Sequence, residues 1–437
     1  LHVRSRRQRQ MCIRDSTMYA SKNQKVTLPD VPKVKGYTNL GWTTEKGETE
    51  PEYSAGDTVK ITKATQFYAV RRKSNYYTVS YYLGNGSTNA AYQKLTQTVE
   101  EGTVVTFAKV PARTGYVNQG WSSKKNSEKA TAKAKCTVNK NITLYAVQKK
   151  AVQLTFHRCD GSTWQKTTLA KGSSYSLPGV RDAEGYTFMG WSTKPMQSVS
   201  PQYEAEEKIT VNGNVDLYAV VFNRTTETDL TEDQLPQVDI YKYKQVIFVG
   251  DSRTEFMENV LTGMGESATK NVKFVCSAGK GLDWFTTTGW AQLYSIVQHD
   301  SNSILSKKTA VIFNFGVNDL SKSADYAEYY NWIAPQLKSK GCELYFMSVN
   351  PVNRLMLPNA GRADRSEAAV RSFNQYMKAN LSSAYTYIDM YSYLKSTGYS
   401  FASDHYGTGT VDDGLHYTTR TYKRIFAKCM DSLRVPA

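Results

Sequence analysis

The 437-residue chain contains no long hydrophobic run and few cysteines. No apolar stretch approaches the ~18 residues that a membrane-spanning helix needs, so the sequence predicts no such helix. The six cysteines are scattered and include no Cys-x-x-Cys pair, which argues against a zinc site and against a dense disulfide framework. We therefore expect neither a bound metal nor a fold held together by cross-links.

Several enzyme signatures are also missing. The sequence has no Gly-x-Ser-x-Gly elbow, no Walker loop and no His-Glu-x-x-His pair. The Gly263-x-Gly265-x-x-Ala268 stretch follows a predicted helix and not a strand, so it does not read as a dinucleotide-binding fingerprint. These absences exclude the common nucleotide-binding, zinc-protease and α/β-hydrolase motifs, and we expect no cofactor.

The net charge of +16 lies mostly in the N-terminal half of the chain. Residues 241–437 hold 22 Lys and Arg against 17 Asp and Glu, which leaves +11 for residues 1–240. No nucleic-acid-binding motif accompanies this excess. A solvated basic surface is the first interpretation, and contact with an anionic bacterial wall polymer is the alternative.

Residues 1–16 differ from the rest of the chain. They are rich in Arg and Gln, show no periodicity, and resemble a translated adapter sequence. We expect a non-native or disordered extension there; a basic nucleic-acid-binding arm is the alternative. If the extension is non-native, we expect the true N-terminus, together with any signal peptide, to lie outside this fragment.

A Gly-Tyr-x-x-x-Gly-Trp motif occurs three times, and each copy is followed by a closing strand that contains Tyr-Ala-Val. The copies are Gly36–Trp42, Gly115–Trp121 and Gly185–Trp191. We predict three β-rich repeats, at residues 17–74, 75–150 and 151–222. The first lacks the opening strand of the others, so we expect it to be truncated.

This motif resembles the Gly-Tyr-x-Phe-x-Gly-Trp repeat of bacterial surface proteins, of the internalin-B B-repeat type. The resemblance implies small β-grasp-like modules that act in tandem as a stalk or binding spacer. Phe188 occupies the central aromatic position, where the earlier copies have Asn39 and Asn118. We expect the Trp and Tyr of each motif to fill a small core, with ligand binding by these rings as the alternative.

Residues 223–240 are aperiodic, contain Pro236 and read as a linker. From residue 241 strands alternate with helices, which predicts a parallel, doubly wound α/β sheet of five strands. The predicted strands are residues 246–249, 272–276, 310–315, 343–349 and 385–388.

Ser252 follows the first of these buried strands, in the segment Gly250-Asp251-Ser252. Ligands bind at the carboxyl ends of the strands in open α/β sheets, so this serine has the position of a nucleophile. The alternative is that Asp251 and Ser252 only cap the helix that follows.

Three further segments place polar groups near the same edge: Gly279, Asn318, and the pair Asp413 and His416. Together with Ser252 they resemble the four ordered blocks of the SGNH (GDSL-type) hydrolases, which have a flavodoxin-like fold. The chain departs from the family pattern at Arg253, where Leu or Ile is usual, and at Tyr417, where Pro is frequent. Gly281 competes with Gly279 for the second block.

The resemblance implies a catalytic Ser252, with His416 as its base and Asp413 as the residue that orients the imidazole. It also implies an oxyanion hole made of the backbone N–H groups of Ser252 and Gly279 and the amide of Asn318. The residues alone leave three other assignments open: His405 as the base, Asp412 as the carboxylate that orients it, and helix capping as the role of the Asn318 and Asp413 side chains. Arg253, Lys280 and Trp284 are candidate pocket residues that can equally be packing or surface residues.

We therefore expect a secreted or cell-wall-associated serine esterase that acts on an ester substrate, with acetylated carbohydrate or peptidoglycan as the first candidate. One alternative is a surface adhesin whose glycan-binding repeats are the active part and whose hydrolase domain is residual. The other is an O-acyltransferase of the same family. The triad itself does not distinguish hydrolysis from transfer.

Overall fold

The computed structural model describes residues 17–298, 307–357, 364–402 and 413–433. The chain divides into two compact units that meet between Lys150 and Ala151, and each is described by itself. The predicted extension at residues 1–16 lies outside the described residues, and so do His299, His405 and Asp412.

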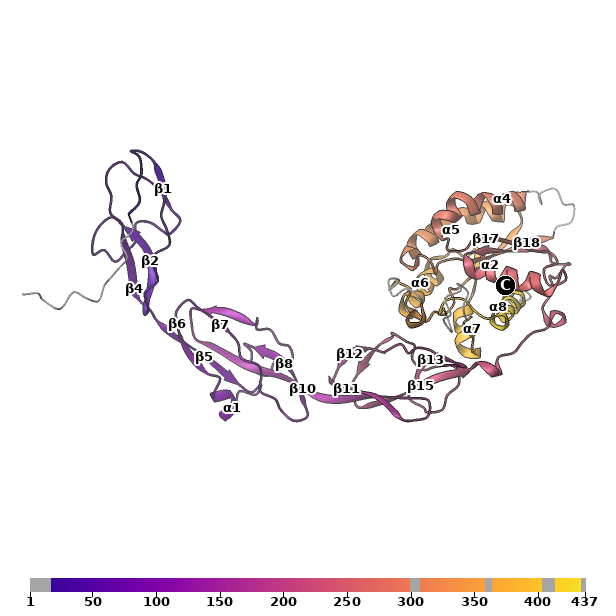
Figure 1. The fold of residues 1–437 in the computed structure, drawn as a ribbon, viewed down its shortest axis with the longest axis horizontal. Helices are drawn as coiled ribbons and strands as arrows, with labels where there is room; N and C mark the ends of the chain where they lie inside the picture. Colours follow the sequence, from indigo (N-terminus) through magenta and orange to yellow (C-terminus); the bar gives the residue numbers. More distant parts are fainter. Residues whose placement is uncertain (1–16, 299–306, 358–363, 403–412, 434–437) are drawn as a thin grey trace, which may run out of the picture. The chain divides into compact units, whose positions relative to one another are not determined.

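The first unit contains two repeats made mainly of antiparallel strand pairs (Figure 1); in the second repeat β5 also pairs in parallel with β10. In the first repeat β1 pairs with β3 and β2 with β4; in the second, β5 pairs with β6, β7 with β9 and β8 with β10. The strands are β1 Lys25–Thr27, β2 Tyr37–Thr43, β3 Thr58–Lys60, β4 Tyr68–Lys73, β5 Tyr76–Tyr82, β6 Gln97–Glu100, β7 Thr103–Thr106, β8 Tyr116–Ser122, β9 Lys135–Val138 and β10 Ile142–His157, with the short helix α1 Ala90–Gln93 after β5.

The tryptophan of every repeat motif is anchored in the same way. Its indole N–H donates to the backbone carbonyl thirteen residues earlier: Trp42 to Pro29 at 2.7 Å, Trp121 to Ala108 at 2.6 Å and Trp191 to Pro178 at 2.8 Å. Trp121 and Trp191 are buried, as expected for core residues. The expectation is wrong for the motif tyrosines, which are exposed because each begins its strand at a turn beyond the core: Tyr37, Tyr116 and Tyr186.

The third repeat opens the second unit. The C-terminal half of β10 pairs with β11 and β15, β13 pairs with β15, and β12 pairs with β14. These strands are β11 Thr163–Ala170, β12 Ser173–Ser176, β13 Tyr186–Ser192, β14 Lys208–Val211 and β15 Val215–Asn223. In its core the Trp191 ring lies 4.8 Å from the centroid of Phe156 and 5.4 Å from that of Phe188.

The segment expected to be a linker packs against the following domain. It forms two 3-10 turns, η1 Arg224–Thr226 and η2 Glu232–Gln234. Leu235 and Val238 are buried in the domain's core. Glu227 is also buried, and its carboxylate pairs with Arg424 at 3.0 Å.

The rest of the second unit is a three-layer α/β/α domain, as predicted from the alternating pattern (Figure 1). Its five strands are parallel, in the order β17-β16-β18-β19-β20. They are β16 Tyr243–Gly250, β17 Val272–Cys276, β18 Lys308–Asn314, β19 Cys342–Met347 and β20 Tyr385–Ile388. This order is that of flavodoxin-like folds.

Helices cover both faces of the sheet. One face packs against α4 Trp290–Gln298, α5 Ser323–Lys338 and α6 Glu367–Asn380, and the other against α2 Ser252–Met264, α7 Met390–Thr397 and α8 Thr419–Ser432. The short helix α3 Leu282–Trp284 and the π-turn η3 Phe285–Gly289 lead into α4, the 3-10 turn η4 Leu320–Lys322 leads into α5, and η5 Arg354–Met356 lies between β19 and α6. Helix α7 was not predicted.

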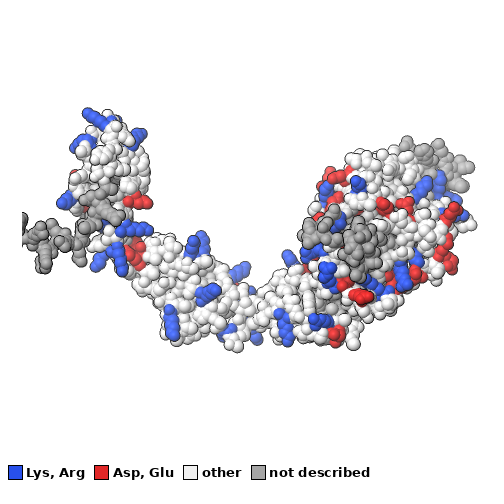
Figure 2. All heavy atoms as spheres, in the orientation of Figure 1, with Lys and Arg blue, Asp and Glu red and all other residues white. Residues whose placement is uncertain are grey.

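Charge and metal-ligating groups are dispersed. In Figure 2, Lys and Arg side chains are scattered singly over the repeats on the face shown and do not gather into one basic patch. Within the described ranges, no group of three or more His, Cys, Asp and Glu side chains is arranged to hold a metal ion. Over the same residues, no helix has the length and apolar character needed to cross a membrane.

Candidate active site

Ser252 lies where the central strand β16 turns into α2. Gly250 ends the strand, and a Cβ there would lie 2.0 Å from Thr254 Oγ1, so only glycine fits. Asp251 is the N-cap of α2, and its carboxylate accepts the Arg253 N–H at 3.0 Å. The capping interpretation therefore applies to Asp251, and it leaves the Ser252 hydroxyl available for another partner.

That partner is His416. Ser252 Oγ lies 2.9 Å from His416 Nε2, and His416 Nδ1 lies 2.5 Å from Asp413 Oδ2. Ser252 comes from the start of α2, while the other two come from the segment just before α8, more than 160 residues later. The fold thus brings together three residues that the sequence identified separately.

Asp413 is held in a fixed position. Its Oδ1 accepts the backbone N–H groups of Leu415 at 2.8 Å and His416 at 2.7 Å, which leaves Oδ2 for the imidazole. Burial raises the pKa of the Asp413 carboxyl, but the hydrogen bonds from the His416 ring and from the two backbone groups outweigh it and keep the pKa below its ordinary value. Asp413 is therefore ionised at neutral pH and favours a proton on Nδ1 of His416.

The His416 ring is also fixed by packing. It is fully buried, and the edge of the Phe256 ring lies against it at a centroid distance of 4.5 Å. The backbone carbonyl of His416 accepts the Ala402 N–H at 2.8 Å. These contacts hold the ring with Nε2 directed at Ser252.

Gly279 lies in the loop after β17 with a φ of +70°, a backbone conformation that favours glycine. Its rival Gly281 has a different role, because a Cβ there would lie 2.4 Å from the Asp319 carboxylate. Asp319 holds the loop by accepting the Leu282 N–H at 2.9 Å and the Tyr326 hydroxyl at 2.7 Å. The geometry assigns Gly279 to the turn and Gly281 to its support.

The amide of Asn318 has a defined orientation. Its Nδ2 donates to the Lys280 carbonyl at 2.7 Å, and its Oδ1 accepts from the Arg365 guanidinium. A carbonyl only accepts and a guanidinium only donates, so both contacts fit a single orientation of the amide. The second Nδ2 hydrogen is not used by these two bonds and remains able to donate.

Arg365 is a site residue that the sequence did not reveal. It is buried and contacts Asn318. Burial raises the pKa of Asp251 to about 6, and the positive charge of Arg365 opposes this shift. Arg365 belongs to none of the four blocks, so no local pattern pointed to it.

Of the three candidate pocket residues, Arg253 is a packing residue. It is buried, and its guanidinium donates to the carbonyls of Leu415, Asn350 and Pro351, each at 3.0 Å. Lys280 is exposed. Trp284 is partly buried, and the centroid of its ring lies 6.0 Å from that of Phe315. Among the other histidines, His157 pairs with Asp216 at 2.8 Å in the third repeat, far along the chain from these residues.

Two family models cover most of the chain. Residues 246–429 match the GDSL-like Lipase/Acylhydrolase family, and residues 13–70, 77–147 and 153–220 match the Listeria-Bacteroides repeat domain. The two models match separate parts of the sequence, in the order predicted for the repeats and the α/β domain.

Two curated proteins of Evansella cellulosilytica are similar to part of the chain. One, provisionally named a Gly-rich membrane protein, is 28% identical over 198 residues, which are 44% of this chain and 22% of that protein. The other, provisionally named a membrane protein, is 25% identical over 192 residues, which are 44% of this chain and 27% of that protein. The chain therefore spans much less than half the length of either relative.

Solved structures are similar to part of the chain. A protein of Slackia heliotrinireducens provisionally described as an SGNH hydrolase covers 44% of this chain and 100% of its own, with 12% identity and a TM-score of 0.31. The acetyl xylan esterase AlAXEase covers 43% and 99%, with 12% identity and a TM-score of 0.30. The family models show that residues 246–429 belong to the GDSL-like Lipase/Acylhydrolase family and follow three Listeria-Bacteroides repeats.

Proposed function

We propose that this protein is a serine esterase that cleaves an ester through an acyl-serine intermediate. The observation that carries the proposal is the continuous chain of hydrogen bonds from Ser252 through His416 to Asp413. A serine hydroxyl is a weak nucleophile until a base accepts its proton, and here a buried imidazole lies within reach of it.

In the first half of the reaction Ser252 Oγ attacks the ester carbonyl carbon while its proton passes to His416 Nε2. The carbonyl electron pair moves to oxygen, and the imidazolium is stabilised by the ionised Asp413 beside Nδ1. When the tetrahedral intermediate collapses, the C–O bond to the alcohol breaks and His416 gives its proton to the leaving oxygen. In the second half water takes the place of the alcohol, and the acid and free enzyme are released.

The negative oxygen of the intermediate needs donors that are already in place. Ser252 is the first residue of α2, and N–H groups in the first turn of a helix lack partners inside the helix. We assign the oxyanion hole to this N–H, the N–H of Gly279 and the outward Nδ2 hydrogen of Asn318. Removing one such donor commonly costs about 10²–10³-fold in rate.

For the substrate we propose a small acyl ester on a cell-surface glycan, such as an acetylated carbohydrate or peptidoglycan. The repeats support this choice because they belong to a repeat family named for Listeria and Bacteroides, and both curated relatives are named membrane proteins. We accordingly place the protein outside the cell or at the cell wall, with the repeats directed to the polymer.

The test is hydrolysis of nitrophenyl acetate, butyrate and octanoate by the full chain. We expect Ser252→Ala and His416→Ala to lower kcat/KM by about 10⁴-fold or more, because the triad acts as a unit. Asn318→Ala should lower it by about 10²–10³-fold. The chain-length profile should favour acetate.

Lys280→Ala is the matched control, because this side chain is exposed and next to Gly279; it should keep wild-type rates. Activity that survives in Ser252→Ala would refute the mechanism. Transfer of the acetyl group to an added sugar in preference to water would identify the chain as an acyltransferase.

A further inference from the structure

The third repeat and the hydrolase domain share one core. Met189, Val220 and Phe222 of the repeat are buried in the same hydrophobic cluster as Met390, Leu394, Tyr399 and Phe401 of the domain. A Cβ on Gly398 would lie 2.2 Å from the Phe222 ring, so this ring packs directly against the backbone of the domain.

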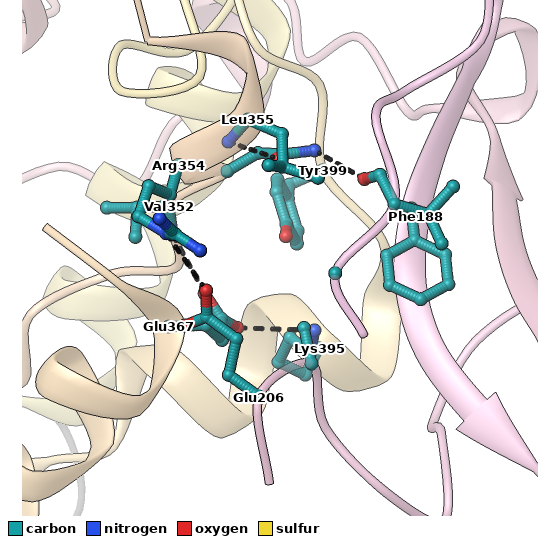
Figure 3. Close-up of a pocket in the computed structure, with 12 residues that line it drawn as sticks. Phe188, Glu206, Val352, Arg354, Leu355, Glu367, Lys395 and Tyr399 are labelled. Atoms are coloured by element: carbon teal, nitrogen blue, oxygen red, sulfur yellow. Dashed lines mark hydrogen bonds and ion pairs between the residues drawn. The ribbon is translucent and has the colours of Figure 1, made fainter. Parts of the chain in front are cut away.

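Polar contacts surround this core. Figure 3 shows Arg354 of the domain directed at Glu206 of the repeat, and the two pair at 3.1 Å. Lys395 is buried between Glu204 of the repeat, at 2.8 Å, and Glu367 of the domain, at 3.4 Å. The cavity lined in part by Glu206, Arg354, Glu367 and Lys395 has a volume of about 20 Å³, room for a single water.

A further polar contact connects the third repeat to a segment next to the active site. The Asp182 carboxylate of the repeat is completely buried, pairs with Arg224 at 2.7 Å, and accepts Asn353 Nδ2 at 2.9 Å. The same Nδ2 donates to the Val180 carbonyl at 3.1 Å. Both hydrogens of the Asn353 amide are thus used to hold it to the third repeat.

The backbone of Asn353 contacts the segment that carries the catalytic pair. Its N–H donates to the Gly414 carbonyl at 2.8 Å, and a Cβ on Gly414 would lie 2.3 Å from the Asn353 carbonyl oxygen. Gly414 follows Asp413 directly and precedes His416 by two residues. The position of Asn353 therefore sets the position of the chain between Asp413 and His416.

The residues before Asn353 support the other side of the same segment. Arg253, which follows the nucleophile, joins the Asn350 and Pro351 carbonyls to that of Leu415. The Tyr417 hydroxyl also donates to Pro351. Segment 350–353 is thus held by the third repeat on one side and holds Asp413–Tyr417 on the other.

We propose that Asn353 is a positioning residue and that the third repeat, acting through Asp182, is a working part of the catalytic domain. The repeat fixes Asn353, and Asn353 fixes the backbone on which Asp413 and His416 sit. This inference rests on the proposed esterase function. It separates the third repeat from a simple spacer, because a spacer would not be needed for turnover of a small soluble ester.

The test compares Asn353→Ala with Arg354→Ala in the full chain. Each variant removes polar contacts to the same repeat, but only Asn353→Ala removes those of the residue whose backbone contacts Gly414. It also removes the amide oxygen that accepts the Leu355 N–H. With nitrophenyl acetate, we expect Asn353→Ala to lower kcat about ten-fold with KM within two-fold, since small misplacements of catalytic groups cost up to ~10²-fold. Arg354→Ala should keep both constants within two-fold of the wild type.

A second readout separates positioning from partial unfolding. Phenylmethanesulfonyl fluoride sulfonylates the serine oxygen with loss of fluoride, so it reports both the fraction of competent sites and the reactivity of each. In Asn353→Ala all sites should react, about ten-fold more slowly, because the misplaced imidazole activates the serine less well. A smaller reactive fraction with an unchanged rate per site would mean unfolding and would overturn the proposal.

An exchange of the two side chains provides a rescue. Asn353→Asp alone places two carboxylates face to face and should reduce kcat at least as much as Asn353→Ala. Adding Asp182→Asn restores a donor–acceptor pair and should recover part of kcat. Equal losses in Asn353→Ala and Arg354→Ala would reject the role of Asn353. A wild-type chain that is inactive, or a Ser252→Ala variant that is active, would instead reject the esterase itself.

Discussion

The third repeat and the first two share a folding motif but differ at the positions that face outward from it. In the aligned strand pairs, Thr38 lies opposite Arg72, Val117 opposite Lys149, and Thr187 opposite Phe222. Arg72 is exposed, whereas Phe222 is buried against the hydrolase domain. A charged position in two repeats has become an apolar contact in the third.

The residue before the Gly-Trp pair shows the same change. It is Leu40 in the first repeat, an exposed Gln119 in the second, and a fully buried Met189 in the third. The tryptophan and its hydrogen bond are unchanged in all three. The residues that fold a repeat are therefore distinct from those that dock it, and the residues at the docking positions differ between copies.

Phe222→Arg, which gives the third repeat the residue of the first, should have the largest effect of such exchanges. A buried ring is lost and a charge is placed in an apolar contact, so we expect about 3–5 kcal/mol less stability for the second unit. Urea unfolding followed by tryptophan fluorescence would measure the change.

The matched control is Lys149→Ala at the aligned position of the second repeat. It should alter stability by no more than about 0.5 kcal/mol, as surface substitutions do. Similar losses in both variants would show that this position supports the repeat fold itself, and the distinction between folding and docking residues would not stand.

Met189→Gln gives the third repeat the residue of the second and should have a smaller effect. The amide of Gln119 is exposed, but at position 189 an amide would be buried among apolar side chains. We expect a loss of about 2–3 kcal/mol from the unsatisfied polar group and the altered packing. Met189→Leu, which is the residue of the first repeat, is the control and should cost less than about 1.5 kcal/mol. A neutral Met189→Gln would indicate that this side chain reaches solvent.

Much of the hydrolase fold could be predicted because the information is local. The central strands contain continuous apolar runs, at residues 246–249 and 310–313. The polar residues of the site follow strands of the sheet or precede the last helix. Ser252, Gly279 and Asn318 could therefore be placed at one sheet edge before their contacts were known. Helix α7 was not predicted because its eight residues are too few for a helical hydrophobic pattern to repeat clearly.

Other features depend on partners that are distant in sequence. Arg253 looked like a departure from the family pattern, but its guanidinium joins carbonyls about 100 and 160 residues away. Arg365 binds Asn318 across 47 residues. A charged side chain in isolation reads as surface, and only the fold shows which charges are buried and paired.

The last and smallest expected effect concerns Glu204, whose counterpart in the first repeat is Ser54. Burial raises the pKa of the Glu204 carboxyl above its ordinary value, although the nearby Lys395 acts to lower it. The folded chain therefore keeps a proton that the unfolded chain releases, so stability falls as the pH rises from the ordinary pKa of glutamate to the raised one, and is level above that. Glu204→Gln should remove this slope, whereas Glu184→Gln, at an exposed position of the same repeat, should leave it intact. Urea midpoints between pH 4 and 8 would measure it, and an unchanged slope in Glu204→Gln would place the titrating group elsewhere.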